Sequence, residues 1–130
     1  TRRHRWGIVG AHLTYPDGRT QHSGVFLRDR EGLEAFNRLR EAPSGEVPAV
    51  TGACLLISKA RFDELGGFDE TFRNAYEDVD LLLKHRSQGG RVWFESSAEV
   101  PHLESRTPGR FTHAAHNIAL LQQRWGDLPI

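Results

Sequence analysis

The sequence predicts a mixed α/β fold, with a mixed sheet, flanking helices and a β-hairpin. Short runs of β-branched and aromatic residues alternate with longer segments in which apolar residues recur at helical spacing. Glycine pairs and proline-containing turns separate these segments. The 130 residues contain no internal repeat, low-complexity tract or long linker, so we expect residues 1–130 to form a single domain.

A β-hairpin is expected near the start of the chain. Residues 6–13 and 21–27 each carry a short apolar run. Between them, Pro16 presets φ, and Asp17 and Gly18 supply the tolerant positions that a tight turn needs. Two apolar runs separated by such a turn signal are typical of a hairpin.

A short helix and a buried strand are expected next. Leu33, Phe36 and Leu39 fall near helical spacing, which predicts a helix over residues 31–41. Residues 43–45 then indicate a loop. The following run, residues 48–57, is apolar and partly β-branched, and therefore favours a buried strand.

The second half of the chain predicts more helix. Ser58 can cap a short helix that the glycine pair at residues 66–67 ends. Residues 77–88 carry acids at the start and bases near the end, as helices do, and residues 91–95 indicate a further strand. The last helix is expected to turn an apolar stripe inward, formed by Phe111, Ala114, Ala115, Ile118, Leu121 and Trp125.

The composition excludes several classes of function. The 17 basic and 17 acidic residues balance, so no overall field attracts nucleic acid and we expect no nucleic-acid partner. Cys54 is the single cysteine, which excludes an internal disulfide framework and a cysteine-rich zinc site. The longest apolar stretches, such as residues 53–57, fall far short of the roughly 20 residues that span a bilayer, so we expect no transmembrane segment.

Two adjacent acids, Glu77 and Asp78, begin a predicted helix. The N–H groups and the dipole at a helix start favour negative charge. An ionised carboxylate at the rim of a pocket can accept the proton of an attacking alcohol, which typically supplies roughly 10² to 10⁴ in rate. From the spacing alone, ordinary helix capping is the commoner explanation of such acids. Neighbouring helical residues point about 100° apart, so the two acids should not share one task.

Four segments, in order, carry a family resemblance: TGACLLI at 51–57, GGFDETF at 66–72, YEDVDLLLK at 76–84 and GGRVWFE at 89–95. Together they resemble the C-terminal half of family 2 glycosyltransferases, inverting enzymes with a GT-A (Rossmann-like) fold. The opening VGAHLTYPDGRTQHSGVFL resembles the preceding segment of bacterial members that build cell-surface polysaccharides and O-antigens. Each piece alone is weak, whereas the ordered set is specific.

The resemblance implies transfer of a sugar from a nucleotide-sugar donor to a hydroxyl of a glycan or lipid-linked acceptor, with inversion. The usual catalytic base of the family maps onto Asp78, and Glu77 would support the acceptor pocket. Gly52 would allow close approach of the sugar. The substrate-binding positions that the resemblance implies are Thr51, Gly52, Ala53, Gly67, Phe68 and Asp69.

The nucleotide-binding half of the family, with its metal-binding DxD motif, has no counterpart in these residues. We therefore expect a divalent metal, Mn or Mg, in the full-length enzyme and none bound to this fragment. Asp78-Val79-Asp80 has the letters of DxD, but it begins a helix instead of ending an apolar strand, and we interpret it as a false match. His102 could complete the metal shell or touch the diphosphate, or be a loop histidine without a task. Arg106 could close over phosphate oxygens or lie in an ordinary solvated loop.

Other hypotheses remain open. The chain could be a non-catalytic module that binds a glycan or a protein, or a small metal-dependent enzyme that uses Asp78, Asp80 and histidines. If the chain is an excised half, we expect it to be inactive in isolation and to self-associate through the exposed sheet edge. The parent enzyme is expected in the cytoplasm, peripheral at the inner face of the membrane, where nucleotide sugars and lipid-linked acceptors meet.

Overall fold

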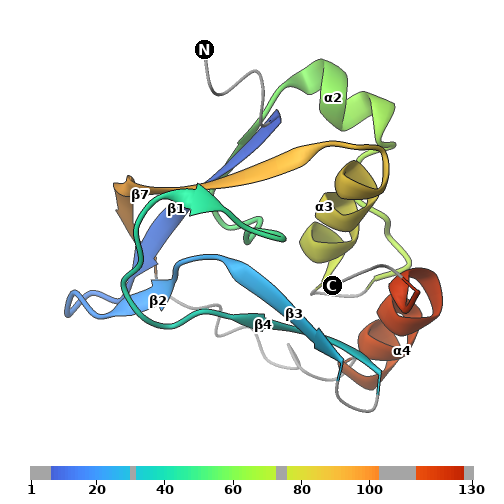
Figure 1. The fold of residues 1–130 in the computed structure, drawn as a ribbon, viewed down its shortest axis with the longest axis horizontal. Helices are drawn as coiled ribbons and strands as arrows, with labels where there is room; N and C mark the ends of the chain where they lie inside the picture. Colours follow the sequence, from blue (N-terminus) through green and yellow to red (C-terminus); the bar gives the residue numbers. More distant parts are fainter. Residues whose placement is uncertain (1–6, 30–31, 73–75, 103–113, 128–130) are drawn as a thin grey trace.

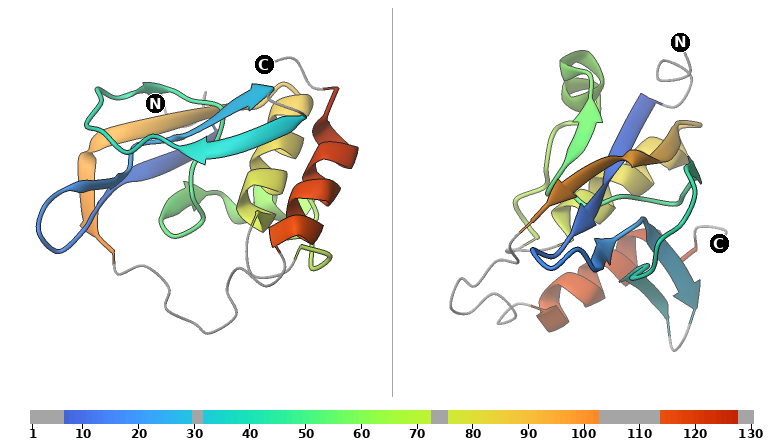
Figure 2. Two further views of the ribbon diagram at one scale, coloured as in Figure 1. Left: turned by 90° about the horizontal axis from the view of Figure 1, so that it is seen from below. Right: turned by 90° about the vertical axis from the view of Figure 1, so that its left-hand side faces the viewer.

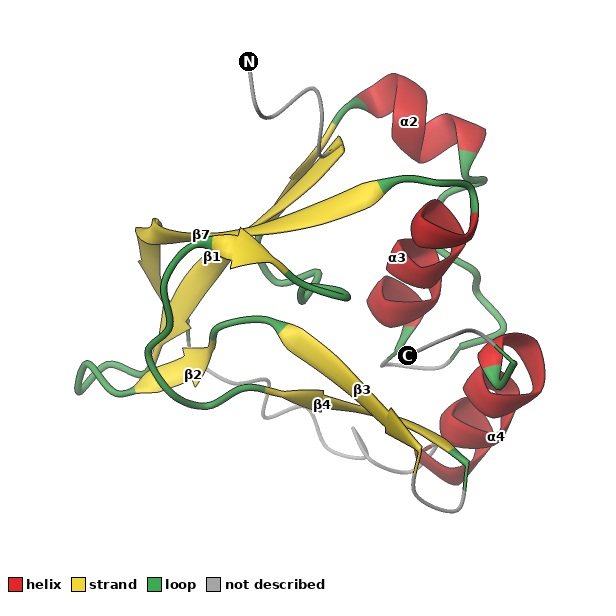
Figure 3. Ribbon diagram, in the orientation of Figure 1, coloured by secondary structure: helices red, strands yellow, loops and turns green. Residues whose placement is uncertain are grey.

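The computed structural model describes residues 7–29, 32–72, 76–102 and 114–127 (Figure 1). The strands are β1 (Gly7–Thr14), β2 (Thr20–His22), β3 (Val25–Asp29), β4 (Leu33–Asn37), β5 (Gly45–Glu46), β6 (Leu55–Ile57) and β7 (Arg91–Pro101). The helices are α2 (Lys59–Glu64), α3 (Glu77–Ser87) and α4 (Ala114–Trp125). All the strands but β7 lie in the first half of the chain, and α3, β7 and α4 follow in the second half (Figure 3).

The larger sheet is mixed, with the strand order β2-β1-β7-β5 and with β6 also paired to β1. β1 and β7 run parallel, whereas β2, β5 and β6 pair antiparallel with their neighbours. Parallel neighbours require a long crossover connection, and here the crossover includes α2 and α3 (Figure 2). The predicted mixed α/β class is confirmed, and the arrangement is compatible with a Rossmann-like fold.

The hairpin between β1 and β2 is also confirmed. Its turn is closed by two backbone hydrogen bonds, from Gly18 N–H to the Tyr15 carbonyl at 2.9 Å and from Tyr15 N–H to the Arg19 carbonyl at 2.8 Å. The second arm is shorter than predicted. β2 ends at His22, and Gly24, with a φ of 120°, lets the chain turn away into β3.

The predicted helix over residues 31–41 is wrong. This segment contains β4, which pairs antiparallel with β3 in a separate two-stranded ribbon. Gly32, with a φ of 110°, donates its N–H to the Asp29 carboxylate at 3.2 Å and helps to return the chain against β3. An isolated helix of about this length is marginal in water, whereas β3 offers the segment a complete backbone partner.

The predicted strand over residues 48–57 is mostly wrong. Only Leu55–Ile57 pairs along β1, as β6. Ala49 makes a single bridge to Val25, and the chain then turns at residues 51–53. The strand predicted at residues 91–95 exists and continues to Pro101 as β7.

The helices α2 and α3 begin and end close to the predicted positions. The Ser58 hydroxyl accepts the Arg61 N–H at 3.1 Å and caps α2. Gly66 and Gly67, with φ values of 87° and 71°, follow α2 in a conformation that disfavours residues with a side chain. In α3, acids occupy the first turn and bases the last, which complements the helix dipole.

The last helix, α4, lies beside the β3–β4 ribbon and close to α3 (Figure 2). The Gln122 side-chain amide donates to the Leu33 carbonyl at 3.2 Å, and Leu121 is buried. The predicted stripe is wrong at Ala115 and Ile118, which are exposed. Asn117 is buried instead, because it lies one turn before Leu121 on the same face of the helix. Trp125 is half-buried, while Phe111 and the Ala114 side chain lie outside the described part of the chain.

The apolar core lies between the larger sheet, α3 and the ribbon. Leu82 and Leu83 of α3 and Ile8, Val92 and Phe94 of the sheet are fully buried. This packing fixes α3 relative to β1 and β7, and with it the acidic start of the helix. No helix in the described ranges has the length and apolar character needed to cross a bilayer.

Candidate functional site

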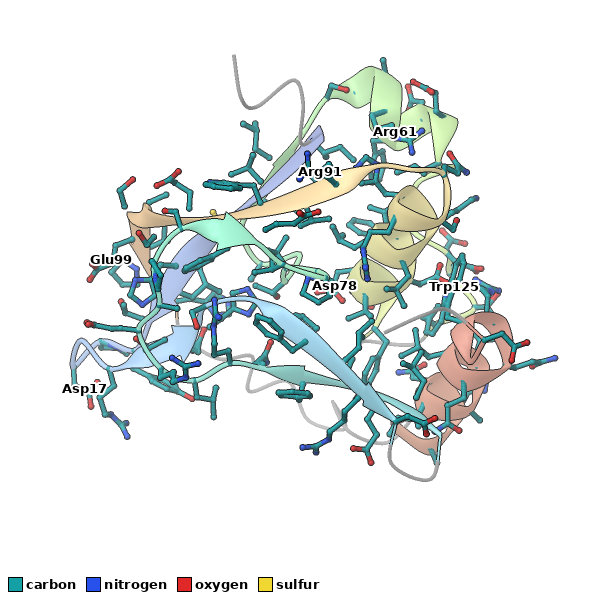
Figure 4. The ribbon with its side chains drawn as sticks, viewed as in Figure 1. Asp17, Arg61, Asp78, Arg91, Glu99 and Trp125 are labelled. Carbon is teal, nitrogen blue, oxygen red and sulfur yellow. The ribbon has the colours of Figure 1, made fainter. Side chains whose placement is uncertain are left out.

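Asp78 lies at the start of α3, directly against the turn at residues 51–53 (Figure 4). Its Oδ2 accepts the Gly52 N–H at 2.7 Å, and its Oδ1 accepts the Val79 N–H at 2.8 Å. A Cβ on Gly52 would lie 3.1 Å from the Asp78 Cβ, so glycine lets this turn approach the helix closely. Two predicted site segments that lie 26 residues apart in sequence therefore meet here.

Every N–H of the turn has its own acceptor. Thr51 N–H points at His22 Nε2, at 3.4 Å, and Ala53 N–H donates to the Thr51 hydroxyl at 3.2 Å. Gly52 and Ala53 are exposed, so the outer side of the turn faces solvent. Since each carboxylate oxygen has two lone pairs, Asp78 retains acceptor capacity beyond its two backbone bonds. The bond to the Val79 N–H lies within the first turn of α3, whereas the bond to Gly52 joins the helix to the turn at residues 51–53.

Glu77 occupies different surroundings from Asp78, as the angle between adjacent helical residues predicts. The Glu77 side chain is half-buried, and its Oε2 is buried with no hydrogen-bond partner among the described residues. Burial raises the pKa of the Glu77 carboxyl, a backbone hydrogen bond within the residue opposes that rise, and the Asp78 charge adds to it. Glu77 thus carries its charge less readily than a solvated glutamate.

Tyr76, directly before the two acids, has a strained backbone. Its φ of 71° makes it the one non-glycine residue in the left-handed region within the described ranges. Such a conformation costs a bulky residue about 1–2 kcal/mol. The Tyr76 side chain packs against the core, and burial, followed by the charges of Asp78 and Glu34, raises the pKa of its phenol. Strain of this kind often accompanies functional sites.

The segment with Gly67, Phe68 and Asp69 lines a hollow of about 740 Å³. Phe68 is 43% exposed and meets Phe62 edge-on, with ring centroids 5.2 Å apart. Lys84 of α3 also lines the hollow and donates to the Leu65 carbonyl at 2.6 Å. The hollow therefore combines an accessible aromatic ring with charged and polar groups.

Asp69 and Asp80 are tied to α4 across this hollow. The Arg124 Nη1 lies 2.7 Å from Asp69 Oδ2 and 3.1 Å from Asp80 Oδ1, and the Trp125 indole N–H donates to Asp80 Oδ1 at 2.8 Å. Hydrogen bonds from the Thr71 backbone and hydroxyl, and then from Arg124, lower the pKa of Asp69 to about 2. Asp69 is thus an ionised anchor for α4 at neutral pH.

The predicted site residues fall into two groups on different sides of α3. Asp78 and the turn at residues 51–53 do not line the hollow, whereas Asp80 does. Asp78 and Asp80 are two residues apart, so their side chains point roughly 200° apart around the helix; Asp78 and Trp125 flank α3 in Figure 4. The two carboxylates therefore do not converge, and no group of three His, Cys, Asp or Glu within the described ranges could hold a metal ion.

His102, the predicted ligand of metal or diphosphate, follows β7 and is held by Gln21 of β2. Gln21 Nε2 donates to the His102 carbonyl at 3.0 Å, and Gln21 Oε1 lies 2.7 Å from His102 Nδ1. Because Nε2 of the amide must donate to the carbonyl, Oε1 faces the ring and His102 Nδ1 carries a proton. In the neutral ring, Nε2 then keeps its lone pair for another ligand. Arg106 lies outside the described residues.

Two residues that the sequence reasoning missed, Gln21 and His22, support these groups. Both are buried, at 7% and 2% exposure, although they are polar and lie in a strand. A signal was present, because the hairpin arm opens with the four polar residues 20–23. Buried polar side chains in a strand need partners, and these two find theirs at the candidate site.

Similarity to known proteins covers most of this chain but only part of each relative. The chain is 35% identical to an uncharacterized protein of Sinorhizobium fredii, over 92% of the chain and 15% of that protein. It is 34% identical to the O-antigen biosynthesis protein RfbC of Myxococcus xanthus, over 76% of the chain and 9% of RfbC. No family model matches the chain.

A third relative carries an enzyme's name. The chain is 36% identical to the N-acetylglucosaminyl-diphospho-decaprenol L-rhamnosyltransferase of Mycobacterium tuberculosis, over 82% of the chain and 41% of that protein. The chain thus spans less than half the length of each of these relatives. It is similar to a segment of proteins named for O-antigen synthesis and for glycosyl transfer, which supports membership of a glycosyltransferase family.

Proposed function

We propose that this chain is the C-terminal, acceptor-binding half of a family 2 glycosyltransferase domain with a GT-A fold. The whole enzyme transfers a sugar from a nucleotide-sugar donor to an acceptor hydroxyl, with inversion, in the synthesis of a cell-surface polysaccharide or O-antigen. It works in the cytoplasm, at the inner face of the membrane. The names of two relatives support this class of reaction.

The observation that carries the proposal is the hydrogen bond between Gly52 N–H and Asp78 Oδ2, at 2.7 Å. It joins the turn and the acidic pair that the resemblance assigns to one site. The bond orients the carboxylate by a main-chain donor, so the position of Asp78 does not depend on a mobile side chain. The exposed outer side of the turn leaves room for a substrate next to the carboxylate.

Asp78 acts as the general base in this proposal. One of its oxygens accepts the proton of the acceptor hydroxyl while the hydroxyl oxygen attacks the anomeric carbon of the donor. The bond from that carbon to the departing diphosphate breaks on the opposite face, and the diphosphate takes the electron pair. A single displacement of this kind inverts the anomeric centre. Glu77 supports the acceptor pocket beside the base.

The acceptor extends from the reacting hydroxyl over the first turn of α3 into the hollow. There, Phe68 offers an aromatic face to a sugar ring, and Asp69 and Lys84 offer polar contacts. Gly67 adds no side chain to the wall of the hollow. A glycan or a lipid-linked sugar is long enough to reach both sides of the helix. By analogy with the name of the mycobacterial relative, an N-acetylglucosaminyl-diphospho-polyprenol is the acceptor to test first.

A divalent metal, Mn or Mg, belongs to the whole enzyme in this proposal. Of the described residues, His102 fits as one nitrogen ligand, because Gln21 fixes its Nδ1 proton and leaves Nε2 as the donor atom. The remaining ligands would come from a DxD motif outside these residues. When bound, the metal would neutralise charge on the diphosphate. Arg106 would contact the oxygens of the diphosphate.

The test compares variants of the natural protein that contains this segment. The substrates are nucleoside-diphosphate sugars, including an activated L-rhamnose, and N-acetylglucosaminyl-diphospho-polyprenol. Asp78→Asn should lower kcat by about 10² to 10⁴. The matched control is Asp63→Asn, an exposed acid of α2 that pairs with Lys59, which should leave kcat unchanged.

Full turnover by the Asp78→Asn variant would remove Asp78 from the role of base. The alternative, a non-catalytic glycan-binding module, makes a different prediction. In that case the protein would bind the acceptor without transferring sugar from any donor, and Asp78→Asn would change the affinity alone. Titration of the chain with acceptor and with nucleotide sugars, followed by NMR, distinguishes the two.

A further inference from the structure

The buried ring of His22 stands between the β3–β4 ribbon and the turn that holds Asp78. His22 is the last residue of β2 and is 2% exposed. Its Nδ1 lies 3.0 Å from Asn37 Oδ1, at the end of β4, and its Nε2 lies 3.4 Å from Thr51 N. The ring therefore connects an exposed residue of the ribbon with the backbone of the candidate site.

The direction of these hydrogen bonds fixes the state of the ring. The Thr51 backbone N–H can only donate, so His22 Nε2 must be the acceptor. The ring proton then lies on Nδ1 and is donated to Asn37 Oδ1. Only the neutral ring with its proton on Nδ1 satisfies both neighbours, because a doubly protonated ring would place an N–H against the Thr51 N–H.

The Thr51 and Gly52 N–H groups belong to consecutive peptide units that meet at the Thr51 Cα, so a rotation of the first unit also turns the second unless the Thr51 dihedral angles offset it. The Thr51 N–H is held by His22, and the Gly52 N–H, one residue later, is held by Asp78. If the turn rotated away from His22, the Gly52 N–H would also change its direction toward the carboxylate. The hydrogen bond from Thr51 to His22 is long, and burial of the ring keeps water from replacing it.

We propose that His22 is the positioning residue of Asp78: its neutral imidazole accepts the Thr51 N–H and thereby aims the Gly52 N–H at the carboxylate. The consequence for catalysis rests on the proposed function, whereas the positioning itself does not. His22 does not touch the reacting atoms. It acts through the turn, and Asn37 acts through His22 by fixing the ring proton.

The positioning is tested on the 130-residue chain by NMR, with the amide signals and hydrogen exchange of Thr51 and Gly52 as readouts. His22→Phe keeps a ring of similar size and removes the acceptor. It should shift both signals and speed exchange of the Gly52 amide by about fivefold to tenfold, as expected for loss of one hydrogen bond. His22→Gln, whose side-chain oxygen can take the place of Nε2, should restore both signals in part.

A second buried histidine supplies the matched control. His12 lies on β1, its Nε2 lies 3.0 Å from the Thr20 hydroxyl, and its ring stands edge-on to Phe94; neither of these partners belongs to the turn at residues 51–53. His12→Phe should therefore leave the Gly52 amide unchanged. If His22→Phe does not fold, a second variant, Asn37→Ala at an exposed position, should still shift the Thr51 signal. This variant removes the acceptor that keeps the ring proton of His22 on Nδ1. An unchanged Gly52 amide in the folded variants would overturn the proposal.

The kinetic consequence is measured on the natural protein that contains the segment. His22→Phe should lower kcat by about tenfold to a hundredfold, with little change in the KM for the donor, because a misplaced base slows the chemical step. If the amide signals respond and the unmodified protein transfers no sugar, the proposed function fails and the positioning stands. If transfer occurs at the same rate in His22→Phe, the catalytic consequence of the positioning is overturned, whatever the amide signals show.

Discussion

Glu77 carries a buried carboxylate oxygen with no hydrogen-bond partner among the described residues. Because burial, aided by the charge of Asp78, raises the pKa of Glu77 against its own backbone hydrogen bond, the folded state binds this proton more tightly than the unfolded chain does. The contribution of Glu77 to stability is therefore greatest below its unfolded pKa near 4.5 and is lost as the pH rises through its folded pKa.

This pH dependence predicts the effect on stability of removing the negative charge of Glu77. Glu77→Gln should raise the midpoint of thermal unfolding at pH 7, and the gain should shrink as the pH falls toward 4. Glu70→Gln, at an exposed acid of the hollow, is the control and should change stability by less than about 0.5 kcal/mol. A lower midpoint for Glu77→Gln at pH 7 would show that the carboxylate has a stabilising partner.

His22 predicts the opposite dependence on pH. Burial of the ring lowers the pKa of His22, and the nearby charges of Arg38 and His12 act in the same direction, while the Asn37 hydrogen bond and the Asp78 charge oppose it. The unfolded chain thus binds this proton more tightly. Stability should be full above pH 6.5 and should fall as the pH drops below that value, toward the folded pKa.

The pH effect is measured by urea unfolding between pH 5 and pH 8, comparing the unmodified chain with His22→Gln. The glutamine variant cannot titrate and should show a flatter profile over this range. Equal slopes in both proteins would mean that other groups cause the loss of stability in acid.

Some contacts of the candidate site could be predicted from the sequence, and others could not. The closeness of Gly52 and Asp78 follows from the family resemblance, which assigns both to one site, and the hydrogen bond between them agrees with it. The support from His22 and Gln21 was not predictable in the same way. Their partners, Thr51 and His102, are 29 and 81 residues distant in sequence, and polar residues in a strand do not reveal which distant group they will meet.

At the scale of the elements, close approach of the backbone decides where glycine is required. A Cβ on Gly10 of β1 would lie 2.4 Å from the Val50 Cβ, whereas a Cβ on Gly45 of β5 would meet nothing within 4 Å. Both glycines lie in strands of the same sheet, and neither has a positive φ. Gly10→Ala should therefore cost about 1–3 kcal/mol through overpacking.

The control, Gly45→Ala, should change the free energy of unfolding by less than about 0.5 kcal/mol. Urea unfolding of the two variants measures the difference directly. Similar losses in both would indicate that the segment around Val50 yields easily and that β1 does not need glycine at position 10.

The elements also show where local pattern misleads. Leu33, Phe36 and Leu39 have the spacing of a helix. The segment nevertheless forms β4, because the backbone of β3 pairs with it antiparallel. A turn signal was present in the sequence, since Asp at position 29 and Gly at position 32 are the residue types typical of the first and last positions of a tight turn. The helices α2 and α3 were predictable because their signals are local: Ser58 caps α2, and acids in the first turn and bases in the last mark α3. Pairing of strands depends on contacts that periodicity does not encode.

At the scale of the whole molecule, the outer edge of β6 in the larger sheet has no strand partner among the described residues. Within the described ranges, β6 pairs only with β1, and Leu56 of β6 is 56% exposed. A short strand with an unpaired edge and an exposed apolar side chain is prone to pair with another chain. We therefore expect the isolated chain to self-associate as its concentration rises.

Light scattering across a concentration series measures this association. Leu56→Lys should lower the apparent mass at high concentration, because a lysine on an edge strand disfavours pairing. Leu39→Lys is the control, since Leu39 is 65% exposed in a loop after β4 and not on a strand edge. A chain that stays monomeric throughout the series would contradict the expectation.

Because Asp78 is attached to a main-chain amide, the position of its carboxylate is independent of the shape of the surface beside it. A carboxylate anchored through the peptide backbone keeps its place when the side chain at position 53 is exchanged, or when serine replaces Thr51 and keeps the bond to the Ala53 N–H, provided that residue 52 stays small. New side chains at those two positions would reshape the neighbouring surface without moving the acid. Under the proposed function, such exchanges would change sugar recognition while the base stays in place.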